Sequence, residues 1–340
     1  MKGPVSRERL LALLSAFTGK RLIVAGDCVL DRFVYGHPKR VSREAPVLIL
    51  RFWKEEDLPG GAGNTAANVK ALGGVPLPVG AIGDDESGVA LRQILQERGI
   101  ETAGLSVVPG YATPTKTRVL GGGPHSIKQQ IVRYDREDSL PKDEVLENVL
   151  AGWLDRLAAG AHGAILSDYG YGSVTPAAVP TLRAKMSPGA PLLVDSRHGL
   201  LRFTGVDAVT PNEEELEECV AESLGDSTEK LRNAGAQVME RIGCSTVLVT
   251  RGSRGMALLE KGAEPVLIPV HGTDQVADVT GAGDTVLATF ALALASGGSP
   301  LEAAHLANFA GGVVVMKMGT ATVTPEELKD AISSDRTILT

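Results

Sequence analysis

A turn of small residues that leads into an apolar helix is the strongest chemical signal in this sequence. Residues 278–285 read DVTGAGDT, and the apolar run VLATFALALA follows them. Such a turn leaves backbone N–H groups unpaired at the start of the helix, where the helix dipole adds partial positive charge. These groups can bind an anion and stabilise the charge on a phosphoryl group during its transfer. The carboxylate of Asp284, at the same turn, could accept the proton of an attacking hydroxyl.

Helix capping is the simpler explanation for Asp284, because Asp is a preferred residue at helix starts. Capping does not account for the small residues Gly281, Ala282 and Gly283, nor for Asp278 six residues before Asp284. We therefore interpret Asp284 as a candidate general base, and the three small residues before it as a candidate anion-binding turn.

A second glycine-rich turn, GGAGN over residues 60–64, precedes the helical stretch TAANVKALG. Glycines such as Gly60 and Gly61 let a ligand approach the backbone closely. Asn64 and Asn68 lie one helical turn apart, so both could face that ligand. The stretch GAGNTA also matches the dinucleotide pattern G-x-G-x-x-A. The preceding residues, KEEDLP, do not read as a buried strand, which argues against this match. An NAD-type oxidoreductase is therefore only a remote alternative, and a simple turn with a helix cap is another.

The elements that must position these residues alternate along the chain. Buried strands are predicted over residues 21–26, 163–168, 191–196, 207–212 and 245–252, and helices over residues 62–73, 86–98, 141–158, 176–186, 227–242, 283–296 and 300–317. This alternation predicts a parallel sheet with helices on both faces.

Polar residues stand at or just past the predicted strand ends: Asp27, Asp31, Asp168, Asp195, Asn212 and Thr250. Ligands of open α/β sheets bind beyond the carboxyl ends of the strands, so these side chains are candidates for one shared cleft. Strand ends are also polar simply because they meet solvent, and for any one residue alone this alternative stays open.

Two regions, 32–57 and 111–135, break the alternation, because they read as antiparallel strands with no helix between them. We expect them to form a small β-sheet attached to a single domain that spans residues 1–340. Such a sheet could cover a site as a lid, or pair with another subunit.

The composition excludes several functions. The chain has 340 residues and a net charge of -7, which argues against a general binder of nucleic acid or anionic membranes. The cysteines Cys28, Cys219 and Cys244 form no CxxC pair and are expected to be free thiols. No apolar run reaches the ~20 residues that span a bilayer, and Ser6 before RERLLALLSAF predicts a capped helix rather than a signal peptide. We expect a cytoplasmic protein.

Two glycines followed by Asn near the N-terminus, with D-x-T-G-A-G-D near the C-terminus, resemble the PfkB/ribokinase family of carbohydrate kinases over nearly the whole chain. The resemblance implies a ribokinase-like three-layer αβα sandwich with a mainly parallel central sheet and a small β-sheet lid. It implies that Asp31 binds sugar hydroxyls beside the 60–68 segment. It also implies that Asp284 is the catalytic base, with residues 281–283 as the anion hole, and that ATP and Mg²⁺ are required.

Further positions receive roles only through this resemblance. Asn212 and Glu215, in TPNEEE, match the N-x-x-E that positions Mg²⁺ and the triphosphate, largely through water. The remaining matches are Thr250, Gly252 and Gly255 near the nucleotide phosphates, Asn308 and Gly319 near the adenine, and Asp278 and Thr280 at a possible K⁺ site. Without the resemblance, the glutamates would simply favour a helix start and TRGSRG would be a hairpin signal. The turn Gly83-Asp84-Asp85 also matches the family, and is expected mainly to cap the following helix.

Several stretches resemble a narrower branch, the heptose 7-phosphate kinases of lipopolysaccharide precursor synthesis: GDCVLDRFVYG, VSREAPVLIL, TKTRVL, QQIVRYDRED, SDYG and VMKMGTATVTP. Members of that branch phosphorylate the anomeric hydroxyl of D-glycero-D-manno-heptose 7-phosphate. Lys116 and Arg118 lie two apart on one strand face and, with Arg133, could clamp the phosphate of such a substrate. Solvated strand charges are the alternative.

The chain departs from that branch where Tyr171 and Arg197 replace lysines, although Arg197 could still bind phosphate. Many relatives carry a C-terminal nucleotidyltransferase domain with an H-x-G-H motif, which this sequence lacks, so no adenylyl transfer is expected. The alternatives are a PfkB-type kinase for fructose, ribose, a nucleoside or another sugar phosphate, and a non-catalytic sugar sensor. Exposed lid strands favour a homodimer.

Overall fold

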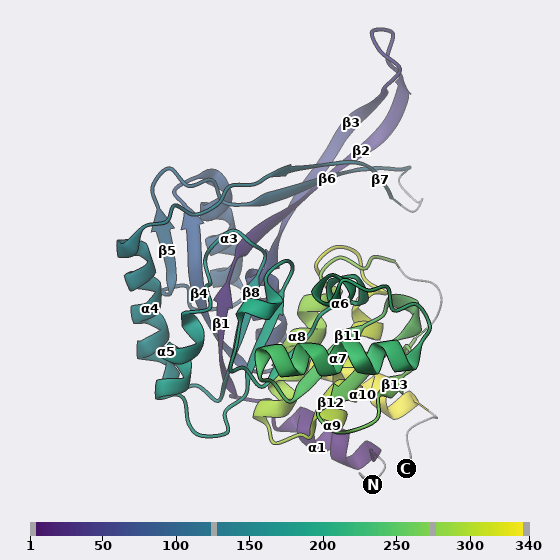
Figure 1. Ribbon diagram of the computed structural model, residues 1–340. Coiled ribbons are helices and arrows are strands. Elements are labelled where there is room, and N and C mark those ends of the chain that lie inside the picture. The colour runs from purple at the N-terminus through teal and green to yellow at the C-terminus, as the bar shows by residue number, and fades with distance from the viewer. Residues whose placement is uncertain (1–4, 124–127, 273–276, 336–340) are drawn as a thin grey trace.

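The computed structural model describes residues 5–123, 128–272 and 277–335, and its largest feature is a nine-stranded sheet (Figure 1). The strand order is β13-β12-β11-β10-β9-β8-β1-β4-β5, and only β12 and β13 run antiparallel to their neighbours. The strands are β1 (Arg21–Gly26), β4 (Val75–Gly83), β5 (Leu105–Val108), β8 (Gly163–Asp168), β9 (Leu192–Ser196), β10 (Ala208–Val209), β11 (Thr246–Thr250), β12 (Met256–Glu260) and β13 (Val266–Ile268).

Helices cover both faces of this sheet, because its central strands are apolar on both sides. Leu22 and Val24 of β1 belong to one hydrophobic core, whereas Ile23 and Ala25 belong to the other. The first core contains α1 (Arg7–Ser15), α2 (Ala62–Ala71), α3 (Glu86–Glu97), α8 (Ala282–Ala295), α9 (Pro300–Val314) and α10 (Pro325–Ser334). The second contains α4 (Glu144–Ala158), α5 (Ala178–Lys185), α6 (Glu213–Val220) and α7 (Thr228–Ile242). The predicted three-layer αβα architecture is confirmed.

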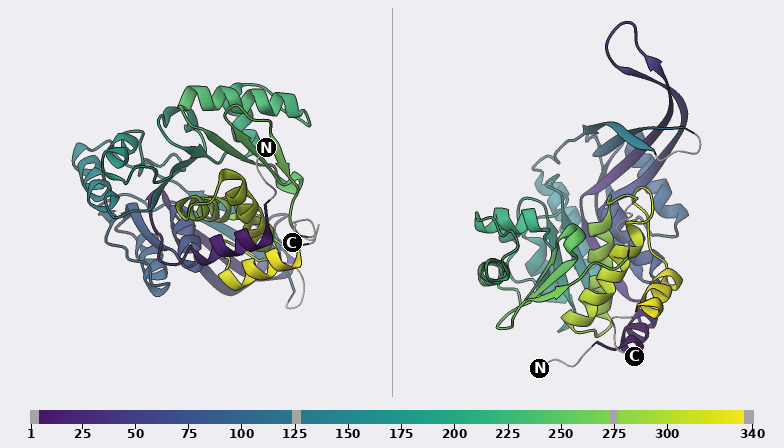
Figure 2. Two further views of the ribbon diagram at one scale, coloured as in Figure 1. Left: turned by 90° about the horizontal axis from the view of Figure 1, so that it is seen from below. Right: turned by 90° about the vertical axis from the view of Figure 1, so that its right-hand side faces the viewer.

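The second sheet is small and has the order β3-β2-β6-β7. Its strands are β2 (Cys28–Val41), β3 (Leu48–Gly61), β6 (Thr115–Gly121) and β7 (Gln129–Arg136). A single residue, Asp27, separates β1 from β2, so the chain passes directly from the large sheet into the small one. Beyond the body of the molecule, β2 and β3 project as a long hairpin (Figure 2). Within the segment 111–135, residues 124–127 lie outside the described residues.

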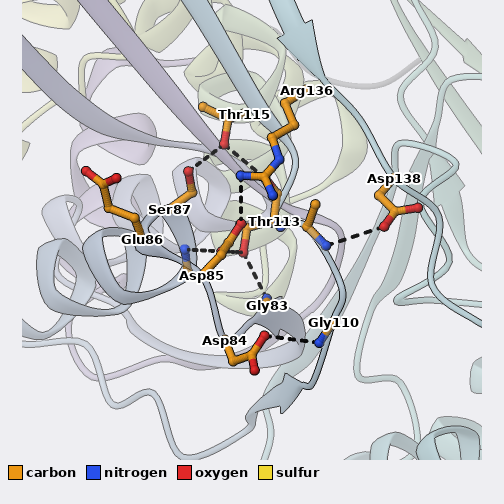
Figure 3. Close-up of polar contacts among 12 residues, drawn as sticks. Gly83, Asp84, Asp85, Glu86, Ser87, Gly110, Thr113, Thr115, Arg136 and Asp138 are labelled. Atoms are coloured by element: carbon orange, nitrogen blue, oxygen red, sulfur yellow. Dashed lines mark hydrogen bonds and ion pairs between the residues drawn. The ribbon is translucent and has the colours of Figure 1, made fainter.

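Polar contacts at the start of α3 hold the base of the small sheet (Figure 3). Asp85 caps α3 and also accepts hydrogen bonds from the backbone N–H of Thr113, at 3.1 Å, and from its hydroxyl, at 2.7 Å. Arg136, the last residue of β7, lies 3.4 Å from the same carboxylate. Thr115 donates to Ser87 at 2.8 Å. Asp85 therefore caps its helix, as expected, and also ties β6 and β7 to the body of the protein.

Candidate active site

One pocket lies between the small sheet, on the face that carries Asp31, the carboxyl ends of the central strands of the large sheet and the start of α8. Its lining residues are Val29, Asp31, Gly61, Lys116, Arg118, Arg133, Tyr169, Arg197, Thr280, Gly281, Asp284 and Thr320. They come from segments far apart in the sequence, because the carboxyl ends of parallel strands share one edge of the sheet. Several residues that the sequence singled out meet in this pocket. They are two acidic residues, one glycine from each glycine-rich turn and three cations of the small sheet: Asp31, Asp284, Gly61, Gly281, Lys116, Arg118 and Arg133.

Asp284 lies in the first turn of α8, and its side chain is almost fully buried. Its Oδ2 accepts a hydrogen bond from Asn64 Nδ2 at 2.8 Å, and its Oδ1 accepts from Thr65 Oγ1 at 3.2 Å and from the Tyr169 hydroxyl at 3.0 Å. Burial raises the pKa of this carboxyl to about 6, while the three donors favour its ionised form. A carboxylate with this pKa is ionised at neutral pH and is still basic enough to accept a proton.

The turn before α8 needs glycine at one position for reasons within the protein. Gly281 has φ +75°, and a side chain there would place Cβ 2.5 Å from Asn64 Nδ2. Gly283 differs, because no described atom lies within 4 Å of where its Cβ would be. The fold does not explain glycine at 283, whereas a ligand resting against the helix start would.

The two asparagines of α2 lie behind Asp284 and do not line the pocket. Asn68 Nδ2 donates to Asn64 Oδ1 at 3.2 Å, and Asn68 Oδ1 accepts from Thr285 Oγ1 at 3.0 Å. This buried chain of hydrogen bonds fixes the orientation of the Asn64 amide, with its N–H directed at the Asp284 carboxylate. The structure thus places Asn64 and Asn68 in support of Asp284.

Asp31, on β2, forms a buried ion pair with Arg118 of β6. Burial raises the pKa of Asp31, and the charge of Arg118 opposes that shift. Gly60, on the neighbouring strand, has no room for a side chain, because its Cβ would lie 2.2 Å from Asp31 Oδ2. The two features that the sequence showed near the N-terminus, Asp31 and the glycine-rich turn at Gly60, therefore lie in direct contact.

Four cations surround the pocket: Lys116, Arg118, Arg133 and Arg197. Lys116 is buried, and burial lowers its pKa, with further lowering from Arg197 and Arg133. Arg133 is bound to Asp135 through Nε at 2.8 Å. Such a concentration of positive charge favours an anionic ligand.

Sequence reasoning missed two residues that the fold brings to this site, Tyr169 and Thr65, which both contact Asp284. Arg197, which was expected to be able to bind phosphate, lines the pocket. Tyr169 follows β8 directly and Arg197 lies just after β9, so their places past strand ends were the available signal. Asp195, which was noticed as a strand-end residue, is bound to Thr210 at 3.0 Å. Burial raises its pKa to about 8, with added repulsion from Glu215 and Asp284.

Asn212, Glu215 and Thr250, which the resemblance assigns to Mg²⁺ and the nucleotide, lie further along the same sheet edge and do not line this pocket, whereas Thr280, assigned to a possible K⁺ site, does line it. Asn212 and Glu215 form a reciprocal capping box at the start of α6, in which each side chain accepts from the other's backbone N–H at 2.8 Å. Thr250 ends β11 and pairs with Asn212 in an isolated bridge. Gly252 and Gly255 both have positive φ, +56° and +78°.

Two further segments carry residues that the resemblance assigns to the nucleotide or to K⁺. Asp278 accepts hydrogen bonds from the Thr280 N–H at 2.9 Å and hydroxyl at 2.7 Å, and from the Gly319 N–H at 3.0 Å. Asn308, on α9, donates to the carbonyl of Pro269 at 2.8 Å. These contacts order the loops that flank the start of α8.

No metal-ligand group of three or more His, Cys, Asp or Glu side chains occurs in the described part of the chain. Likewise, none of the described helices is long and apolar enough to cross a membrane.

Solved structures share this fold at low sequence identity. Arabidopsis thaliana ribokinase, in complex with ribose and ATP, superimposes with a TM-score of 0.71 at 22% identity, covering 94% of this chain and 100% of the other. Phosphofructokinase-2 from Escherichia coli, in complex with substrates and products, gives 0.74 at 18% identity, covering 93% and 99%. At this identity the likeness concerns the fold.

Curated relatives are more similar in sequence. The bifunctional protein HldE of Mesorhizobium japonicum is 40% identical over 331 residues, which are 97% of this chain and 65% of that protein. The bifunctional protein HldE of Caulobacter vibrioides is 41% identical over 333 residues, 96% of this chain and 66% of that protein. The chain thus spans about two thirds of the length of these relatives. The model of the pfkB family carbohydrate kinases matches residues 20–327, and the chain therefore belongs to that family.

Proposed function

We propose that this protein is an ATP-dependent kinase that phosphorylates the anomeric hydroxyl of D-glycero-D-manno-heptose 7-phosphate to give the 1,7-bisphosphate. The observation that carries the proposal is one pocket that contains a buried carboxylate with a pKa of about 6, Asp284, and four cations suited to a substrate phosphate. Family membership and the relatives described above support sugar phosphorylation. The motifs shared with the heptose 7-phosphate kinases support the choice of sugar.

The chemistry is an in-line displacement. The sugar hydroxyl oxygen attacks the γ-phosphorus of ATP, the bond to the bridging oxygen breaks, and ADP leaves. Asp284 takes the hydroxyl proton. General-base catalysis of this kind typically accelerates a reaction by ~10²–10⁴-fold. The N–H groups of Gly281 and Gly283 stabilise the charge on the phosphoryl oxygens, whereas the Ala282 N–H, also expected to contribute, donates to the Val279 carbonyl at 3.2 Å. Asp31 and the glycine-rich turn at Gly60 and Gly61 bind the sugar hydroxyls.

The donor set of the site suits Mg²⁺, which prefers oxygen ligands and keeps much of its water shell. Burial raises the pKa of Asp195, and the charges of Glu215 and Asp284 raise it further, so a cation placed there would relieve their repulsion. Asn212 and Glu215 would hold Mg²⁺ largely through water, and the ion would neutralise charge on the triphosphate. Asp278 and Thr280 would help to hold K⁺ near the start of α8.

ATP binds on the neighbouring part of the sheet edge, where Thr250, Gly252 and Gly255 approach its phosphates, and Asn308 and Gly319 lie near its adenine. The two glycines with positive φ support this assignment, because they allow backbone close to a phosphate. A protein that consumes ATP and a sugar phosphate is expected to work in the cytoplasm.

A coupled ADP-release assay tests the function. The panel contains D-glycero-D-manno-heptose 7-phosphate, fructose, fructose 6-phosphate, ribose and a nucleoside, each with ATP and Mg²⁺. We expect the heptose phosphate to give the highest kcat/KM. A higher value for another sugar would identify a different kinase of the same family. If no compound of the panel led to ADP release, the proposed activity would be contradicted.

The pH dependence of turnover follows from Asp284. Because its pKa is raised to about 6, the ionised base predominates above that pH and is lost below it. We expect kcat to fall about tenfold per unit as the pH drops below this value, and to level off above it. Steady-state kcat at saturating substrates between about pH 5 and pH 9 measures the profile. A rate that stays constant through this acid range would exclude a base with the pKa of Asp284.

The small sheet also supports a homodimer. Strand register places Phe52, Val132 and Tyr134 on the sheet face that points away from Asp31, and they are 64%, 49% and 59% exposed. Apolar side chains at this level of exposure favour burial against a partner. Sedimentation velocity should give a dimer for the wild type and a monomer for Phe52→Glu combined with Val132→Asp. Val145→Glu, on the equally open surface of α4, is the control and should stay dimeric; a monomeric wild type would refute the dimer.

A further inference from the structure

Tyr169 lies between the candidate base, Asp284, and two of the four cations around the pocket. Its hydroxyl donates to Asp284 Oδ1 at 3.0 Å. Its ring lies 5.8 Å from Lys116 Nζ and 5.2 Å from Arg197 Cζ, measured to the ring centroid. Cations at this distance from the face of an aromatic ring are attracted to it. Tyr169 thus contacts both halves of the proposed site, although no sequence motif assigned it a role.

The loop that carries Tyr169 is held from beneath by Asp27. This buried carboxylate accepts hydrogen bonds from the backbone N–H groups of Tyr169, Tyr171 and Ser173 at 2.8, 3.0 and 2.8 Å. Asp27 lies between β1 and β2, so the loop after β8 is fastened to the point where the two sheets join. The place of the Tyr169 ring is therefore set by the protein and needs no ligand.

The hydrogen bonds of Asp284 use its two oxygens unequally. A carboxylate offers about four lone-pair sites, two on each oxygen. Thr65 and Tyr169 both donate to Oδ1, whereas only Asn64 donates to Oδ2. Oδ1 is thereby saturated, and the remaining lone pair belongs to Oδ2.

We propose that Tyr169 is a positioning residue that fixes the Asp284 carboxylate so that Oδ2 accepts the proton of the sugar hydroxyl. This inference rests on the proposed kinase activity. Tyr169 has two effects in this role: it prevents rotation of the carboxylate, and it stabilises the ionised form by donating to it. Burial and the nearby Asp284 charge keep the pKa of the Tyr169 phenol well above its usual value, so the hydroxyl remains a donor.

Other charged groups also face Asp284, and they do not change when Tyr169 is altered. They are Asp31 on β2, Lys116 and Arg118 on β6, Arg133 on β7, and Asp195 and Arg197 at the end of β9. Tyr169→Phe removes one oxygen and keeps the ring between the cations. Its effect on Asp284 therefore reports the lost hydrogen bond.

The test compares Tyr169→Phe with Tyr171→Phe, a matched control on the same loop whose hydroxyl donates to Glu137 instead. We expect the acid limb of the kcat profile to move up by about one pH unit in Tyr169→Phe, because a lost hydrogen bond to a charged group raises the pKa of the acceptor. At the wild-type midpoint kcat should fall about fivefold, further below it about tenfold, and it should approach the wild-type value at higher pH. KM for ATP should not change, and Tyr171→Phe should match the wild type.

A second measurement does not depend on turnover. In protein labelled with ¹³C at the aspartate carboxyl carbons, the Asp284 signal is assigned by its loss in Asp284→Asn and titrated by NMR. The same upward shift of about one unit is expected in Tyr169→Phe. An unshifted titration, or an equal shift in Tyr171→Phe, would overturn the role of Tyr169. If the wild type phosphorylates no sugar, the proposed function fails, and this titration still decides whether Tyr169 sets the state of Asp284.

Discussion

We expect Asp284→Asn to lower kcat by about 10²–10⁴-fold, because the variant has no group that can take the hydroxyl proton. The proposed phosphate-binding turn before Asp284 is untouched, so KM for ATP should change little. ADP release at saturating substrates measures the loss. Since an amide does not become basic at any accessible pH, the activity should not recover on raising the pH.

The same variant should fold normally, for a reason visible in the hydrogen bonds of Asp284. The amide oxygen of Asn can take the place of Oδ2 and accept from Asn64, at the present 2.8 Å. The amide N–H₂ then faces the hydroxyls of Thr65 and Tyr169, which accept hydrogen bonds as readily as they donate them. No buried polar group is left without a partner, so the melting temperature should stay close to that of the wild type.

Asp143→Asn is the matched control for this substitution. Asp143 caps α4 on the surface, where its side chain accepts from the Val145 N–H at 2.9 Å, and Asn is an equally good cap. This variant should have wild-type activity. If Asp284→Asn kept more than about a tenth of the wild-type kcat while remaining folded, Asp284 would not be the general base.

Much of the fold could be predicted from the sequence because local patterns and the global arrangement agree. Strands apolar on both faces, separated by helices, have few arrangements other than a layered parallel sheet. That arrangement brings the carboxyl ends of β1, β8 and β9 to one edge. Asp31 and Asp284 lie outside these strands, on β2 and α8, so their meeting in one pocket was expected only from the family resemblance.

β4 escaped prediction because the segment VPLPVGAIG carries two prolines, which argue against a central strand. The structure shows why they are tolerated. The Val75 N–H donates to Lys20 on the β1 side, and the Gly80 N–H donates to Gly104 on the β5 side. The backbone N–H positions of even-numbered residues are therefore directed toward β5. That strand pairs with β4 only from Gly80 onward. Pro76 and Pro78 lie where no partner strand needs their missing N–H groups.

The site was less predictable wherever it depends on side chains from distant segments. Tyr169 and Asp284 are 115 positions apart, and nothing local in the SDYG stretch indicates that the phenol will reach a carboxylate on α8. The opposite problem arises at Asn212 and Glu215. Their N-x-x-E spacing suits a reciprocal helix cap, which they form, so the local pattern alone cannot separate capping from an additional role toward Mg²⁺.

Lys116 is the residue whose loss should weaken binding of the sugar phosphate most selectively. Its side chain is buried, yet no ion pair joins it to a carboxylate among the described residues, whereas Arg118 pairs with Asp31 and Arg133 with Asp135. Asp135 and Glu137 act on the Lys116 ammonium only from beyond ion-pair distance. A buried ammonium without a direct ion-pair partner is costly, and a substrate phosphate would supply one. Lys116→Met should therefore fold at least as stably as the wild type.

We expect Lys116→Met to raise KM for the sugar phosphate by about 10–100-fold, the worth of one charge-assisted hydrogen bond to a phosphate, and to leave KM for ATP within about twofold. Arg118→Met should raise KM for the sugar as well, but it also releases Asp31 from its ion pair and should therefore lower kcat. Lys142→Met, at an exposed position before α4, is the control and should behave as the wild type.

A substrate without the phosphate sharpens this test. If Lys116 binds the phosphate, Lys116→Met should lose its preference for the phosphorylated sugar, while its kcat/KM for the same sugar without the phosphate stays at the wild-type level. An equal rise in KM for ATP and for the sugar phosphate would place Lys116 outside the sugar-phosphate site. An equal loss with both sugars would mean that the lysine acts on the sugar ring or on the shape of the pocket. Arg118, Arg133 and Arg197, which line the same pocket, would then be the remaining candidates for the phosphate.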